Sequence, residues 1–219
     1  MKPNIAKIYM VWRPAMGTRR IPVGFFHKHD GKYKFHYIKE GVIKAKRMGF
    51  VSFPAFPETD KIYDENIINI LSKRINDPNR SDIKEYYQFW EVREKEQKDP
   101  FRVLAHTTGT LATDNFEFLV DYYGVKNLKQ VSEIAGLSKT MIPSEILKEG
   151  DILDWKLEKD NSYDPKAVAV YKGDIKIGYV KAIHNQIFHK KGSNRLQIRT
   201  KKIEANGHLK KIHIVIQYI

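Results

Sequence analysis

Hydrophobic and polar residues alternate in three short runs near the start of the chain, and this pattern predicts a small antiparallel sheet. The runs are KIYMVWR at residues 7–13, RRIPVGFFHKH at 19–29 and KYKFHYI at 32–38. Alternation with a period of two is typical of half-buried strands. Asp30 and Gly31 separate the last two runs, and an Asp-Gly pair between strands indicates a tight hairpin turn.

Apolar residues at helical spacing predict helices after this sheet. We expect one helix over residues 65–75 with Asp64 as its N-cap, a second over 82–96 that opens after Ser81, and a short third over 99–106. The prolines and aromatics of residues 50–63 indicate an irregular segment lying on the sheet. The first part of the chain is therefore predicted to be an α+β domain.

The second part reads as a β domain. Residues 167–171 and 175–180 predict a hairpin, 195–203 and 208–218 predict two more strands, and 143–147 predict a short helix. Asn161, Asp164 and Pro165 are turn-forming residues that predict a loop at the mouth of the hairpin. Residues 129–139 are ambiguous between helix and strand on periodicity, and a domain boundary is expected around Gly124 to Asn127.

Several spaced motifs of the second part resemble the HIRAN domain. They are Gly150-Asp151, then Asn161-Ser162-Tyr163-Asp164-Pro165, then Ala167 and Val170, then Ile177-Gly178-Tyr179-Val180. The resemblance implies a small β-barrel of the OB/SH3-like kind with short helices over residues 128–219, and it makes residues 129–139 the first barrel strand. HIRAN domains that accompany helicase-like DNA repair proteins bind single-stranded DNA at a free 3′ end.

The same resemblance implies roles for individual residues. Tyr163 would stack on the terminal base, Asp164 would accept a hydrogen bond from the 3′-hydroxyl, and Asn161 would be their loop neighbour. Tyr179 and Lys181 would face the backbone phosphates. A carboxylate repels phosphate, so its presence in such a site fits a hydroxyl donor, and stacking on Tyr163 suits single strands. The alternative is that Asn161 and Asp164 only build a turn while Tyr163 covers the barrel edge.

The chain departs from the DNA-binding HIRAN pattern after Gly136-Leu137. The family places a basic and an aromatic residue there, and the aromatic forms the other half of a base sandwich. Here Ser138 and Lys139 follow. One stacking partner is therefore absent, and Lys139 is expected to hold a phosphate.

Residues 5–120 resemble the N-terminal subdomain of HipA-type kinase toxins. The resemblance rests on the hairpin, on FPAFPE and NILSKRINDPNRSDIKEY, and on Pro100, Phe101, Leu104, Thr108, Gly109, Leu111, Thr113 and Asp114. It implies a docking module over residues 1–123 and a bacterial toxin–antitoxin setting. The kinase motifs themselves are missing from the sequence. The competing function is therefore an antitoxin-like regulatory protein that binds a HipA-type kinase or another protein.

The net charge of the chain indicates an anionic partner. The 219 residues carry a formal net charge of +13, and Lys176 to Ile219 contribute +9, with ten Lys or Arg against Glu204. A basic strand face beside an aromatic loop predicts a single-strand groove, although a solvated basic surface is the simpler alternative. The predicted DNA-binding residues are Lys139, Asn161, Tyr163, Asp164, Tyr179, Lys181, Lys190, Lys191, Arg195 and Arg199.

Other chemistry finds little support in the sequence. The chain has no cysteine, no long apolar run and no signal-peptide pattern, so we expect a cytoplasmic protein without membrane contact. Asp151, Asp154, Glu158, Asp160 and Asp164 suggest a metal nuclease, but no matching histidine or lysine accompanies them. His27 and His29 share a strand face without an evident third metal ligand. We therefore predict a non-enzymatic DNA-binding protein with no cofactor.

Overall fold

The computed structural model describes residues 7–15, 18–122, 128–137 and 140–219. The chain divides into two compact units, Ile5–Asp121 and Tyr122–Ile219, which we call the N-terminal unit and the barrel unit. The predicted boundary at Gly124 to Asn127 lies outside the described residues. Among those that are described, no helix is long and apolar enough to cross a membrane.

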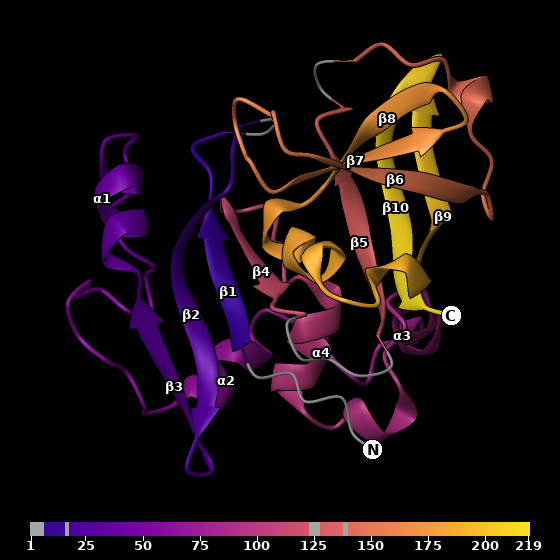
Figure 1. Cartoon of the computed structure of the whole chain (residues 1–219). Helices are drawn as coiled ribbons and strands as arrows, with labels where there is room; N and C mark the ends of the chain where they lie inside the picture. The colour runs from indigo at the N-terminus through magenta and orange to yellow at the C-terminus, as the bar shows by residue number, and fades with distance from the viewer. Residues whose placement is uncertain (1–6, 16–17, 123–127, 138–139) are drawn as a thin grey trace. The chain divides into compact units, whose positions relative to one another are not determined.

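The N-terminal unit is built on a four-stranded antiparallel sheet with the order β3-β2-β1-β4 (Figure 1). Asp30 and Gly31 both have positive φ, 48° and 78°, and turn the chain between β2 and β3 as expected. The elements are β1 (Lys7–Trp12), β2 (Ile21–His29), β3 (Lys32–Tyr37), α1 (Lys39–Lys46), α2 (Ile67–Ser72), α3 (Ile83–Phe89), η1 (Glu94–Glu96), α4 (Pro100–Thr107) and β4 (Phe116–Val120).

Aromatic rings fill the core on one face of this sheet. Phe26 and Phe35 are cross-strand partners with no exposed surface, and Phe56 from the irregular segment stacks on Phe35 with ring centroids 4.4 Å apart. Phe118 on β4 contacts Phe26. The segment rich in prolines and aromatics thus covers the sheet, as the sequence predicts.

Two of the predicted helices are shorter than expected, and one helix was missed. Asn66, in the left-handed region, precedes α2, so Asp64 is not the N-cap. α3 ends at Phe89 because Glu91 takes a φ of 56°, which an α-helix cannot accommodate. α4 agrees with the sequence: the Asp99 side chain accepts from the N–H groups of Phe101 and Arg102 and caps it. The missed helix is α1.

The barrel unit is a closed six-stranded barrel with the order β10-β5-β8-β7-β6-β9 (Figure 1). Its core holds Ile177, Ile198, Ile214 and Ile216, none of which has exposed surface. The elements are β5 (Lys129–Ala135), η3 (Ser144–Ile146), β6 (Ile152–Glu158), β7 (Ala167–Lys172), β8 (Ile175–Val180), η4 (Ala182–His189), η5 (Ser193–Arg195), β9 (Leu196–Asn206) and β10 (His208–Tyr218). The predicted α+β class, a small sheet with helices followed by a small barrel, is confirmed.

The barrel closes between β5 and β8 through a glycine. A Cβ placed on Gly178 would lie 2.5 Å from the carbonyl oxygen of Ala135, so any larger residue would push the two strands apart. Of the ambiguous segment, residues 129–135 form the strand β5. The long 3₁₀ element η4, which the sequence analysis missed, packs Phe188 against Trp155 of β6 with centroids 5.0 Å apart.

Candidate nucleic-acid interface

The loop between β6 and β7, residues 159–166, holds the central predicted site residues. Asn161 shapes it: its Oδ1 accepts from the N–H groups of Tyr163 at 3.0 Å and Asp164 at 3.1 Å. This is an Asx turn, the local bond that asparagine forms when the chain reverses. Asn161 therefore acts on the backbone of the two residues predicted to touch DNA.

The start of the loop is held by the ends of β6 and β8. Glu158 Oε2 accepts from Asn161 Nδ2 at 2.9 Å and from the Tyr179 hydroxyl at 3.0 Å, while its Oε1 lies 2.6 Å from Lys176 Nζ. The Lys176 hydrogen bond, followed by that of Asn161, lowers the pKa of Glu158, and the same carboxylate raises the pKa of Lys176. Glu158 is therefore ionised at neutral pH and fixes three side chains.

The end of the loop is held by η4. Asp164 Oδ1 accepts from the Lys166 N–H at 2.9 Å, and its Oδ2 accepts from Asn185 Nδ2 at 3.0 Å. Asn185 also donates to the Lys166 carbonyl at 2.8 Å, and His189 Nε2 lies 3.0 Å from that carbonyl. A carboxylate has about four lone-pair positions, so the two donors orient Asp164 and leave it able to accept from a ligand hydroxyl.

Tyr163 lies between these two anchors and is 74% exposed. A large aromatic side chain that is exposed to this degree offers a ring face on which a base can stack. The structure thus places Asn161, Tyr163 and Asp164 in one loop, beside the Tyr179 hydroxyl of β8, which donates to Glu158. Their roles in binding DNA stay predictions. The structure adds Glu158, Lys166, Lys176, Asn185 and His189 to this region.

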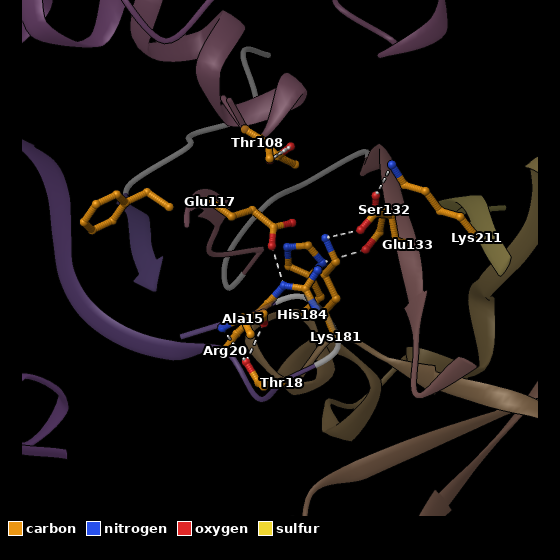
Figure 2. Close-up of polar contacts among 12 residues, drawn as sticks. Ala15, Thr18, Arg20, Thr108, Glu117, Ser132, Glu133, Lys181, His184 and Lys211 are labelled. Atoms are coloured by element: carbon orange, nitrogen blue, oxygen red, sulfur yellow. Dashed lines mark hydrogen bonds and ion pairs between the residues drawn. The ribbon is translucent and has the colours of Figure 1, made fainter. Parts of the chain in front are cut away.

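Lys181 differs from its predicted place. Instead of facing a ligand, its Nζ lies 3.0 Å from Glu133 Oε2, and the side chain is 2% exposed. Lys211 Nζ lies 3.0 Å from the other Glu133 oxygen, and Figure 2 shows both lysines directed at this carboxylate. Burial would raise the pKa of Glu133, but the two lysines outweigh it and lower the pKa. The ammonium group of Lys181 is therefore paired with Glu133 of β5 inside the barrel unit and does not face a ligand.

The predicted basic residues are spread over the barrel unit rather than gathered beside the loop. Arg199 pairs with Ile152, the first residue of β6, whereas the loop follows Glu158, the last one; six strand residues span about 20 Å. Arg195 Nε donates to the Ile219 carbonyl. Lys190 and Lys191 follow directly on His189, which contacts the loop. Lys139 lies outside the described residues.

The sequence gives little indication of the residues that hydrogen-bond to the loop. Glu158 and Asp164 belong to the acidic string that suggests a metal site. In the structure their carboxylates meet Lys176 and Asn185 instead, and the described residues contain no group of three or more His, Asp or Glu side chains placed to hold a metal ion. Asn185 carries no motif, because its role depends on how η4 packs.

A family model covers most of the barrel unit. The family model of the HIRAN domain matches residues 128–212, and we assign this part of the chain to that domain. Two solved structures also match: the HIRAN domain of human HLTF, at 14% identity over 42% of this chain and 76% of that chain with a TM-score of 0.33, and a protein from Lactobacillus plantarum, at 18% identity over 42% of this chain and 98% of that chain with a TM-score of 0.31. No curated protein matches the chain. The HipA-type resemblance of residues 5–120 stays a prediction.

Proposed function

We propose that the protein binds DNA through the β6–β7 loop of its barrel and captures single strands or their 3′ ends. The HIRAN assignment of residues 128–212 supports a DNA-binding role. The observation that carries the finer proposal is the pairing of the exposed Tyr163 ring with the oriented Asp164 carboxylate.

The two side chains suit two parts of one ligand. A ring that is open to solvent stacks on a base at about 1–3 kcal/mol per base, with little dependence on the base. A carboxylate next to it repels internal phosphates but accepts from a terminal hydroxyl, and a hydrogen bond to a charged group contributes about 1.5–3 kcal/mol. Lys166, Lys190 and Lys191 supply positive charge for the backbone around this point.

The test is fluorescence anisotropy of the intact protein with a short 5′-labelled single strand that ends in either a 3′-hydroxyl or a 3′-phosphate, at two salt concentrations. We expect the hydroxyl strand to bind at least about fivefold more tightly, which corresponds to ~1 kcal/mol. An Asp164→Asn variant should reduce this preference. Equal binding of both strands would contradict end capture and leave general single-strand binding; absence of binding would contradict the proposal as a whole.

The proposal includes two further parts that rest on sequence. The chain acts by binding and not by catalysis, so an end-labelled strand should stay intact with Mg²⁺ or Mn²⁺; cleavage that Asp164→Asn and Glu158→Gln both remove would contradict this. The N-terminal unit docks another protein, supported by its resemblance to the HipA-type subdomain. Titration calorimetry with a HipA-type kinase tests that part, and the absence of heat would contradict the antitoxin-like version of it.

A further inference from the structure

A second group of aromatic and basic side chains lies on the face of the N-terminal sheet opposite the phenylalanine core. Cross-strand partners in an antiparallel sheet point to the same side. Phe25 pairs with His36, His27 with Lys34 and His29 with Lys32 across β2 and β3, while Lys7 and Tyr9 of β1 pair with His27 and Phe25. Phe26 and Phe35 point to the opposite, buried side. We call this set the imidazole face: Lys7, Tyr9, Phe25, His27, His29, Lys32, Lys34 and His36.

Three rings of the imidazole face are in mutual contact. Phe25 and His36 stack with centroids 5.1 Å apart and planes 3° from parallel, and His27 lies 4.8 Å from His36. The Nε2 atoms of the two histidines are 2.8 Å apart and share a hydrogen bond, so one ring donates and the other accepts. Each of the three side chains is half-buried, which leaves part of each ring open to a ligand.

Cations surround these rings. Lys7 Nζ lies 4.5 Å from the centroid of Phe25, and Lys34 and Lys32 follow on β3. Acids also lie on this side of the sheet: Asp30 is 3.0 Å from His29 Nδ1, Asp121 acts on Tyr9, and Glu117 of β4 pairs with Arg20. Burial lowers the pKa of His27 and of His36; His36, His29, Lys7 and Lys34 lower that of His27 further, and Lys34 that of His36. Both rings are therefore neutral at pH 7.5 and gain positive charge in acid.

We propose that the imidazole face is a second binding surface for single-stranded nucleic acid, separate from the β6–β7 loop. Bases stack on the ring group formed by Phe25, His27 and His36, and phosphates pair with Lys7, Lys32 and Lys34. Flat rings between cations suit alternating bases and phosphates, whereas an acidic protein segment would use the charges alone. The nearby phosphates favour the protonated imidazoles, so the surface takes up protons as it binds, and binding strengthens as pH falls.

The experiment uses the full chain with the loop site disabled by Tyr163→Ala and Asp164→Asn. Anisotropy with a labelled thymidine oligomer should show residual binding in this background. Adding Lys32→Glu and Lys34→Glu should weaken that binding at least about tenfold, because two phosphate contacts are lost and two negative charges repel the strand. The slope of log affinity against log salt should also fall by about 0.7 for each lost contact. Lys84→Glu, a single reversal on the exposed surface of α3, is the control in the same unit and should have little effect. Thermal unfolding of each variant shows whether the fold is kept.

The pH dependence separates stacking histidines from general charge. Residual binding should rise several-fold between pH 7.5 and pH 5.5, and His27→Gln with His36→Gln should remove the rise. The inference would be overturned if the Tyr163→Ala, Asp164→Asn protein bound no oligomer. It would also be overturned if Lys32→Glu with Lys34→Glu reduced the residual affinity no more than Lys84→Glu does. Tighter binding of a poly-glutamate peptide than of the oligomer at equal salt would overturn it too. If the loop substitutions change nothing but the face substitutions abolish binding, the loop proposal fails and this inference stands.

Discussion

At the residue scale, the proposed binding role depends most on one exposed ring, that of Tyr163. Tyr163 lies at the tip of a loop whose two ends are each held by hydrogen bonds, through Asn161 and Glu158 on one side and through Asp164 and Asn185 on the other. The backbone that carries the ring is thus ordered before any ligand arrives. Pre-ordering of this kind reduces the entropy lost on binding.

Replacing Tyr163 separates stacking from charge. We predict that Tyr163→Ala weakens single-strand binding by about 1–3 kcal/mol, or roughly 5- to 150-fold, because the stacked base loses its partner. Tyr163→Phe keeps the ring and should bind within about twofold of the natural protein. Anisotropy at fixed salt measures both. If Tyr163→Ala bound as tightly as Tyr163→Phe, the ring would only cover the barrel edge.

A buried carboxylate stabilises the N-terminal unit. Glu96 is 3% exposed in its side chain and accepts from Arg93 Nη2 at 2.6 Å and from Arg102 Nη1 at 3.2 Å, with His106 Nε2 3.3 Å away. Burial would raise the pKa of Glu96, but hydrogen bonds from His106 and Arg93 outweigh it and lower the pKa below its ordinary 4.5. The ionised group therefore contributes stability above about pH 4.5, and this contribution is lost as the pH falls.

We predict that Glu96→Gln lowers the free energy of unfolding of this unit at pH 7 by about 3 kcal/mol, the lower end of the range for breaking a buried ion pair, since Arg93 is partly exposed. Urea denaturation followed by tryptophan fluorescence measures the change. The difference from the natural protein should shrink below pH 4.5, because Glu96 of the unfolded chain then takes up a proton while the folded protein still holds the ionised carboxylate. Exposed Glu94→Gln in the same turn is the control. An equal loss at pH 3 and pH 7 would rule out the charge as the cause.

At the scale of elements, η4 positions the loop. Asn185 on η4 links the Asp164 carboxylate to the Lys166 carbonyl, and Phe188 on the same element packs on Trp155 of the barrel. The loop is therefore oriented by a segment that follows it by about twenty residues and is itself fixed by the hydrophobic core.

Removing this link should reduce end recognition more than overall binding. We predict that Asn185→Ala weakens the preference for a 3′-hydroxyl over a 3′-phosphate by about fivefold, because Asp164 loses a donor worth ~1 kcal/mol. The exposed neighbour Gln186→Ala should keep the full preference. Paired anisotropy titrations with the two strands give the ratio directly. A ratio that survives in Asn185→Ala would show that the Lys166 N–H alone orients the carboxylate.

Over the whole molecule, charge sets how strongly binding depends on salt. The segment from Lys176 carries +9, but part of that charge is already paired inside the protein, as Lys181 and Lys211 are with Glu133. The number of cations that meet phosphate is therefore smaller than the sequence count suggests.

We predict that Lys190→Gln with Lys191→Gln lowers the slope of log affinity against log salt by up to about 1.4, at about 0.7 for each phosphate contact with a single strand. These two residues follow the helix that contacts the loop. Arg199→Gln, at the far end of β6, should leave the slope almost unchanged. Anisotropy at four or more salt concentrations yields the slopes. A larger change for Arg199→Gln would indicate a ligand path along β9 instead.

The sequence by itself determined the class of fold and the identity of the loop. Strand alternation, the Asp30-Gly31 turn and the Asn161 to Pro165 motif depend on neighbours in the chain, so local chemistry was enough to predict them. The helix expected over residues 99–106 belongs to the same group and is observed as α4, although the sequence analysis did not name Asp99 as the residue that caps it.

Only the tertiary structure decided which charges remain available. Lys181 and Arg199 look alike as basic residues in the sequence, yet one is paired with Glu133 across the barrel wall and the other lies at the end of β6 opposite the loop. His36 likewise joins His27 only through the register of β2 and β3. Partners of this kind come from strands and helices far apart in the chain. Side-chain pairing across them depends on register and packing, which no local pattern encodes.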